Sequence, residues 1–366
     1  MSRFASLPGA VAGDHGIAHY GEPLREQRAL DRGTAFAELA DRAVVALTGP
    51  ERLTWLNSIT SQAVDRLPAG ASTELLVLDV QGRVEHAAGV YDDGETTYLL
   101  VDIDDAEPLS TWLLRMRFRA QVEIAATTDW VLVGFNAGGA AEAVVTAVLG
   151  DDARIWVDPW SVVTPGGWQY SHAAEHPGAD RSWREAIVTP AQRDALIAQR
   201  GSVTAAGLLS VDALRIAAWR PRWANERDDR VIPHEVDWLR SAVHLNKGCY
   251  RGQETVAKVH NLGHPPRRLV MLHLDGSDSV IPAPGTTVYD GEDEVGVVTS
   301  AAMHHELGPI ALAIVSRRVP VESSLSVRLD DVVISAAQEV IVPADAGATA
   351  NVPRLTRLSR RPLKQD

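Results

Sequence analysis

The chain has 366 residues, of which 45% are hydrophobic and 23% charged, with one cysteine and a formal net charge of −13. This length predicts two or three domains, the negative charge argues against general nucleic-acid binding, and a single cysteine excludes both an intramolecular disulfide and a multi-cysteine metal or cluster site. No apolar run approaches the roughly 18–20 residues that span a bilayer and the N-terminus lacks the apolar core of a signal peptide, so we expect a cytoplasmic protein without a membrane partner.

The first predicted unit covers residues 31–128. Residues 1–30 are rich in Gly, Ala and Pro with little periodicity, so we expect them to be only partly ordered. Hydrophobic spacing then predicts alternating helices and strands: a helix at 50–59, strands at 74–79, 83–91 and 97–101, a helix at 106–118 and a strand at 121–124. This order is typical of an α+β unit.

The second predicted unit covers residues 129–264 and also alternates helices with strands. It contains strands at 130–135 and 155–157 and helices at 140–149, 190–199 and 211–219. From 265 to 343 the pattern changes to short β-like runs separated by turns, which predict a small β-barrel or sandwich. Residues 344–366 are rich in Ala, Pro and Arg, and we expect a disordered tail.

A basic segment runs from Arg215 to Arg268. It holds eleven Lys and Arg against six Asp and Glu, a local charge of +5 in a chain of −13. Two interpretations remain open at this point. The segment binds an anionic ligand, or its arginines form ion pairs with the charged run at 226–230.

The only cysteine, Cys249, lies in this segment within the run KGCYRGQET at 247–255. A helix is predicted to begin at Gly252 and to end near Gly263. A thiol just before a helix N-terminus, between Lys247 and Arg251, favours the thiolate form. The pattern therefore indicates a reactive or ligand-contacting cysteine, and the alternative is a small buried hydrophobic residue.

The same run resembles the signature of the YgfZ family, folate-binding relatives of the glycine-cleavage T-protein that support iron–sulfur proteins. Other parts of the chain are similar to the family in the same order, over about residues 30–345. They are the stretches LTGP at 47–50, DVQGRV at 79–84, DALRI at 212–216, IPHE at 232–235 and RRL at 267–269.

The resemblance implies a three-lobed, T-protein-like α+β fold, with two intertwined ferredoxin-like units and a C-terminal β-barrel around a folate channel. It implies tetrahydrofolate as cofactor, iron–sulfur client enzymes as partners, and no metal site in the chain itself. Cys249 and Lys247 are the implied catalytic residues, with Lys247 as electrostatic partner of the thiolate. The implied folate-contacting residues are Tyr250, Arg251, Gly252, Gln253, Glu254, Arg215 and Arg222.

Two departures from the T-protein pattern bear on the activity. The paired aspartates that handle folate-nitrogen chemistry in T-proteins are absent from residues 82–87, where Glu85 is the nearest carboxylate. Ala217 stands where the family has a glutamate that meets the pterin, so a pterin would need another acceptor. We therefore expect a folate-binding protein that supports iron–sulfur enzymes. The alternatives are a folate-dependent aminomethyl transferase using Glu85, and a non-catalytic scaffold for cluster-assembly partners.

Overall fold

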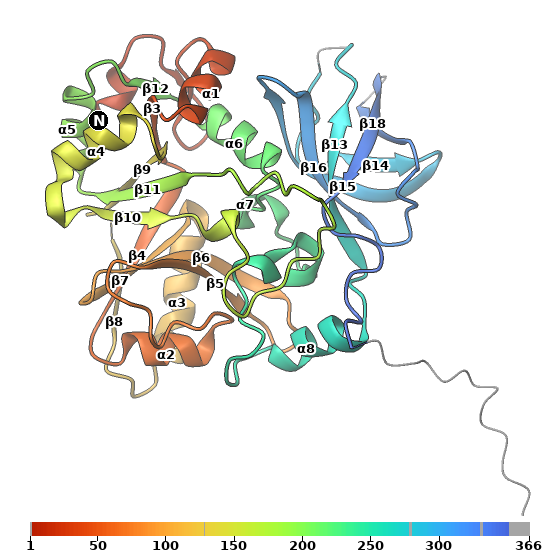
Figure 1. Ribbon diagram of the computed structural model, residues 1–366, viewed down its shortest axis with the longest axis horizontal. Coiled ribbons are helices and arrows are strands. Elements are labelled where there is room, and N and C mark those ends of the chain that lie inside the picture. Colours follow the sequence, from red (N-terminus) through yellow and green to blue (C-terminus); the bar gives the residue numbers. More distant parts are fainter. Residues whose placement is uncertain (1, 128, 278–279, 330–331, 351–366) are drawn as a thin grey trace, which may run out of the picture.

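The computed structural model describes residues 2–127, 129–277, 280–329 and 332–350. Its strands form two five-stranded sheets, a closed barrel and a small two-stranded sheet, β1 (Val11–Ala12) with β2 (Ile17–His19). The two large sheets lie one above the other, and the barrel stands beside them (Figure 1). The α+β fold with a C-terminal barrel is thus confirmed.

The first sheet has the strand order β5-β6-β7-β4-β8, and all its pairs are antiparallel. The strands are β4 (Arg42–Thr48), β5 (Ser72–Leu78), β6 (Val84–Asp92), β7 (Thr96–Asp102) and β8 (Glu123–Thr127). Helices α2 (Arg52–Ile59) and α3 (Ala106–Met116) bury Leu56 and Leu113 against Val45, Val77 and Leu99 of the strands. An apolar stripe on each helix thus covers one face of this sheet.

The second sheet has the order β10-β11-β9-β3-β12. Its strands are β3 (Ala35–Glu38), β9 (Val131–Asn136), β10 (Arg154–Val157), β11 (Trp183–Val188) and β12 (Thr204–Ala206). Helices α4 (Ala140–Leu149) and α5 (Pro190–Ala198) pack in one core with the buried residues Val133, Phe135 and Val188 of the strands. Thr189 and Gln192 form a capping box at the start of α5, which explains why that helix begins there.

The two units are interleaved along the chain. Strand β3 belongs to the second sheet, where it pairs in parallel with β12, although its residues fall in the predicted first unit. Residues 2–30 are also more regular than predicted, since they contain β1, β2 and helix α1 (Pro23–Asp31), and the Phe4 side chain is fully buried. An aromatic anchor and a helix hold this segment on the second sheet, and low periodicity in the sequence concealed both.

The C-terminal lobe is a closed six-stranded barrel in the order β13-β16-β15-β14-β17-β18. Its strands are β13 (Arg267–Leu274), β14 (Thr287–Asp290), β15 (Asp293–His304), β16 (Gly308–Ser316), β17 (Leu325–Leu329) and β18 (Val332–Val340). The barrel prediction is therefore confirmed. Residues 351–366 of the predicted tail lie outside the described residues, whereas Thr349 and Ala350 donate backbone hydrogen bonds to carbonyls near the end of helix α8 (Gln253–Leu262).

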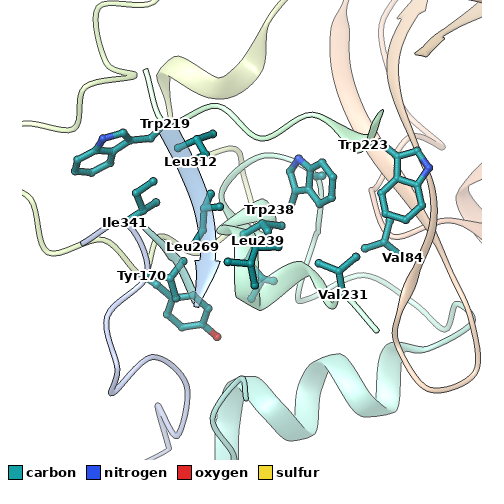
Figure 2. Close-up of a cluster of buried hydrophobic side chains, with 14 of the residues drawn as sticks. Val84, Tyr170, Trp219, Trp223, Val231, Trp238, Leu239, Leu269, Leu312 and Ile341 are labelled. Atoms are coloured by element: carbon teal, nitrogen blue, oxygen red, sulfur yellow. The ribbon is translucent and has the colours of Figure 1, made fainter. Parts of the chain in front are cut away.

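A shared apolar core joins the three lobes. Val84 of the first sheet, Trp238 of the connecting segment and Leu269 of the barrel belong to one buried cluster (Figure 2). Trp219, which follows helix α6 (Leu208–Ala217), and Trp223, which begins the short helix α7 (Trp223–Glu226), are buried in the same cluster, so their role is packing. Because one core serves all three lobes, the cysteine segment is held against each of them.

Candidate functional site

The cysteine loop precedes helix α8, as the sequence predicts. The helix begins at Gln253, with Gly252 as N-cap, and Gly263 caps its C-terminus. Cys249 is exposed, while the next residue, Tyr250, is only 7% exposed and belongs to the shared core. The buried ring anchors the loop and leaves the thiol facing solvent, which excludes the alternative of a buried hydrophobic cysteine.

Lys247 has a different set of partners from the predicted one. Its ammonium donates to the carbonyl oxygens of Asn57, Thr60 (2.6 Å) and Gln62 (2.8 Å), at the end of helix α2 and just beyond it. It also lies 5.1 Å from the centroid of the Tyr250 ring. Burial lowers the pKa of Lys247 to about 8. The predicted electrostatic partner of the thiolate is thus engaged as a clamp between the loop and the first sheet.

Gly252 brings the loop into direct contact with the turn between β5 and β6. Its φ of +83° is in the left-handed region, and a Cβ at this position would lie 2.6 Å from the carbonyl oxygen of Asp79. Such an approach is open only to glycine. Gly252 thus bends the loop, and the neighbour that it approaches is protein backbone.

Two polar side chains complete the support of the loop, and a third does not. Gln253 donates from Nε2 to the carbonyl oxygen of Lys247 (3.3 Å). Arg251 pairs with Glu85 of strand β6 (2.7 Å), and both side chains of this ion pair are about one third exposed. Glu254 is exposed in the first turn of α8, where a carboxylate favours the helix N-terminus. The Glu85 carboxylate is therefore engaged by the cysteine loop itself.

The basic segment is neutralised by acids from distant strands. Arg222, one of the implied folate contacts, pairs with Asp102 (2.6 Å) and Asp41 (2.5 Å), whose carboxylates are buried. Burial alone would raise the pKa of Asp102, but Arg222 and Arg42 outweigh it and hold that pKa below its usual value.

Arg215, the other predicted folate contact of this segment, is 4% exposed. Its guanidinium donates to Asp212 (3.0 Å) and to the carbonyl oxygen of Arg220 (3.0 Å). Arg220 in turn pairs with Glu74 (2.6 Å) and Asp158 (3.2 Å). Ion pairing is thus the correct interpretation of this part of the segment, although the counter-charges come mainly from outside the run at 226–230.

These ion pairs surround a central cavity of about 80 Å³ between the two sheets. Four buried polar atoms of its lining have no hydrogen-bond partner in the described part of the chain: Oδ1 of Asp41, Oε1 of Glu74, Oε2 of Glu185 and Nη2 of Arg215. The three carboxylate oxygens can accept hydrogen bonds from the amino and ring N–H groups of a pterin, and the guanidinium nitrogen can donate one to its carbonyl oxygen. Glu185 is a functional candidate that the sequence analysis did not single out, although it is a buried charged residue in strand β11.

The volume of the cavity does not match a pterin. An engineered cavity of about 150 Å³ is needed to hold a single benzene ring, and this space is about half as large. Trp156 fills part of the region, and it lies so close to β6 that a Cβ on Gly89 would be 2.8 Å from the indole. The side chains as they stand therefore do not accommodate a two-ring folate head group.

The strand that carries the catalytic aspartates in T-proteins is apolar where it faces the cavity. Ala87, Ala88 and Gly89 of β6 line it, and none of them can transfer a proton. The adjacent His86 is instead buried against Asp105, with Nδ1 2.7 Å from Oδ1, and burial raises the pKa of Asp105. Ala217 packs against the shared core, so the place of the family's glutamate is also apolar.

A buried polar cluster supports helix α8 from below. Tyr170 donates its backbone N–H to Oδ1 of Asp237 (3.0 Å), and its hydroxyl lies 3.0 Å from Nδ1 of His260 on α8. Burial raises the pKa of Asp237 to about 7 and lowers that of His234 to about 3. His234 donates from Nε2 to the carbonyl oxygen of Val256 (3.0 Å), which ties the cluster to the helix.

Two further findings limit the chemistry of the site. Within the described residues, no group of three or more His, Cys, Asp or Glu side chains is placed to hold a metal ion. In the same part of the chain, no helix combines the length and the apolar character that crossing a bilayer requires.

Comparison with known proteins agrees with this architecture. Residues 267–343 match the family described as the glycine cleavage T-protein C-terminal barrel domain. The crystal structure of the glycine cleavage system aminomethyltransferase T from Bartonella henselae superposes with a TM-score of 0.75, at 17% sequence identity, over 93% of this chain and 96% of that one. The chain thus has the T-protein fold, and its C-terminal barrel matches the barrel domain of that family.

The chain is equally distant from two kinds of relative. It is 23% identical to the mitochondrial iron-sulfur cluster assembly factor IBA57 homolog of Aspergillus clavatus, over 72% of this chain and 62% of the relative. It is also 23% identical to a probable aminomethyltransferase of Thermococcus kodakarensis, over 79% and 80% of the two chains. The chain therefore spans less than two thirds of the length of the first relative.

Proposed function

We propose that this protein supports the assembly or repair of iron–sulfur enzymes through the exposed thiol of Cys249. The observation that carries the proposal is the construction of the loop. Tyr250, Lys247 and Gly252 fix the backbone on both sides of a thiol that none of them covers. Such rigidity is what positioning a single reactive group requires.

One thiolate falls short of the four ligands that a typical cluster takes from protein. In this proposal Cys249 offers a single sulfur ligand or nucleophile, and a client protein supplies the remainder of the site. The similarity to a cluster assembly factor homolog supports this assignment.

A gene-deletion strain tests the proposal. We expect the activity of iron–sulfur dehydratases or methylthiotransferases to fall on deletion and to return with the wild-type chain but not with Cys249→Ala or Cys249→Ser. Gly248→Ala is a matched control, because a Cβ there meets no atom within 4 Å. If a folded Cys249→Ser variant restores full activity, the thiol is dispensable and the scaffold alternative takes its place.

Aminomethyl transfer is the second candidate, and the distance to aminomethyltransferases is the same. The alanines and glycine of β6 at the cavity, and the engagement of Glu85 by Arg251, argue against it. We expect no turnover of an aminomethyl donor with tetrahydrofolate. Turnover that Glu85→Ala abolishes would establish the transferase instead.

Tetrahydrofolate remains the cofactor that the family resemblance predicts, although no step is assigned to it here. Binding in the central cavity would require Trp156 or the Arg220 ion pairs to move. A fluorescence titration tests this, since displacement of Trp156 changes its emission. Saturable binding with a changed emission would retain folate in the proposal, and no binding at millimolar concentration would remove it.

A further inference from the structure

A second, larger pocket lies on the lobe of the second sheet, between helix α1 and the loop before β12. It has a volume of about 650 Å³, within the range of small-molecule sites. Helix α1 and strand β12 are neighbours at the free edge of the second sheet (Figure 1). Neither the thiol nor the ion pairs of the central cavity reach this pocket.

The walls of the pocket carry four arginines: Arg25, Arg28, Arg32 and Arg200. The first three are spaced i, i+3 and i+7 along α1 and its C-cap, so they share one face of the helix. Arg200 faces them from the loop after α5. Arginines from two separate elements thus converge on one space.

The two acids of the pocket are already engaged. Glu22 pairs with Arg25 (2.7 Å), and Glu26, 7% exposed, accepts hydrogen bonds from the backbone N–H groups of Tyr20 and Gly207. Within the described residues, Arg28, Arg32 and Arg200 form no ion pair. This contrasts with the basic segment near the thiol, where Arg220, Arg222 and Arg267 are all paired with carboxylates.

Arginines without acidic partners in the described part of the chain create a local positive potential at this pocket, which attracts an anion. The whole chain carries −13, so a basic pocket is not a by-product of its general composition. The hydroxyl of Ser202 lines the same space and can donate to an anion. The hydroxyls of Thr34 and Thr204 donate to the carbonyl oxygens of Ala29 and Thr34.

We infer that this pocket binds a compact polyanion, a small molecule with several phosphate or carboxylate groups. Guanidinium groups bind both kinds of oxyanion in bidentate geometry. The apolar side chains of Leu7 and Pro8 line the pocket as well and offer a surface to the uncharged part of the ligand.

Isothermal titration calorimetry of the full chain with inorganic triphosphate and, separately, with citrate tests the inference and distinguishes phosphate from carboxylate ligands. We expect at least one probe to bind with 1:1 stoichiometry. The double variant Arg28→Glu/Arg32→Glu should weaken its binding at least tenfold, and so should Arg200→Glu on the opposite wall.

Arg66→Glu is the matched control, because its side chain is 95% exposed outside the pocket and the charge change is the same. Its affinity should stay within twofold of the wild type. The inference is overturned if neither probe binds at 10 mM, or if the control weakens binding as much as the pocket variants do. If the double variant on α1 does not fold, the affinity of the Arg200→Glu variant for the probe decides whether the inference stands.

Discussion

The ammonium of Lys247 lies where three backbone carbonyls converge, beside a helix end whose dipole is negative. A lysine next to a cysteine in sequence suggests activation of the thiol. The geometry gives this lysine a mechanical role, since it joins the loop to the segment after α2. A single residue can therefore preserve a functional loop without taking part in its chemistry.

Lys247→Met should lower the free energy of unfolding by about 2 kcal/mol, because charge-assisted hydrogen bonds to three carbonyls are lost. Urea denaturation measures the change. Lys258→Met is the control, because Lys258 is exposed on α8 and should leave stability within about 0.5 kcal/mol of the wild type. An unchanged midpoint for Lys247→Met would contradict the clamp.

The buried carboxyl group of Asp237 predicts that the stability of the protein depends on pH. Its carboxyl has a pKa of about 7 when buried in the folded chain and an ordinary, much lower pKa when unfolded. The folded state therefore binds the extra proton between these values, and the contribution of this group to stability falls as pH rises through about 7. His234 and His176, with pKa values lowered by burial to about 3 and 4, act in the opposite direction and lose stability as pH falls below about 6.5.

The comparison with Asp237→Asn isolates the carboxyl group, because the amide oxygen can still accept from Tyr170. The stability of the wild type relative to this variant should decline between pH 5 and pH 8. Thermal unfolding at both pH values gives the difference. A constant difference would mean that Asp237 titrates near its ordinary value.

At the scale of elements, long periodic segments were predictable from the sequence and short charged ones were not. Helix α4 was predicted at 140–149 and spans Ala140–Leu149. The sequence does not predict strand β11, because the adjacent charged residues Arg184 and Glu185 interrupt its apolar pattern, and Glu185 lines the central cavity. The cysteine loop and the start of α8 were predictable, because glycines and a cap mark them locally.

Gly252→Ala should destabilise the protein by about 1–3 kcal/mol, the usual range for a side chain forced into the left-handed region. The clash with the Asp79 carbonyl should also loosen the loop, so alkylation of Cys249 should change in rate. Gly248→Ala serves as the control, because a Cβ there meets nothing within 4 Å. Equal effects of the two substitutions would contradict the close approach.

At the scale of the whole molecule, the basic segment shows why charge counted along a sequence can mislead. Its net charge is +5 by sequence, yet Asp41, Glu74, Asp102 and Asp158 neutralise it from strands and turns far away. No local pattern reports these pairings, because the fold alone brings the partners together. The ion pairs join the two sheets and the connecting segment into one body.

Arg222→Met should lower the free energy of unfolding by about 3–5 kcal/mol, since it leaves two buried carboxylates without their cation. The deficit should shrink as pH falls below about 4, because the stability that the lowered pKa of Asp102 provides is lost there in the wild type as well. Denaturation at pH 7 and pH 3.5 measures both effects. Arg230→Met, at an exposed position of the same segment, should change little.

The exchange of β3 into the second sheet has a consequence for synthesis. Strand β3 pairs with β9 and, in parallel, with β12, which is about 170 residues further along the chain. At about 5–20 residues per second, a ribosome needs on the order of 10–30 s to make the missing partner. During that interval the apolar residues of β3 have no finished sheet to enter. The nascent chain is thus a natural client for chaperones, because the second sheet cannot be completed before β12 has emerged, whereas all strands of the first sheet lie within residues 42–127.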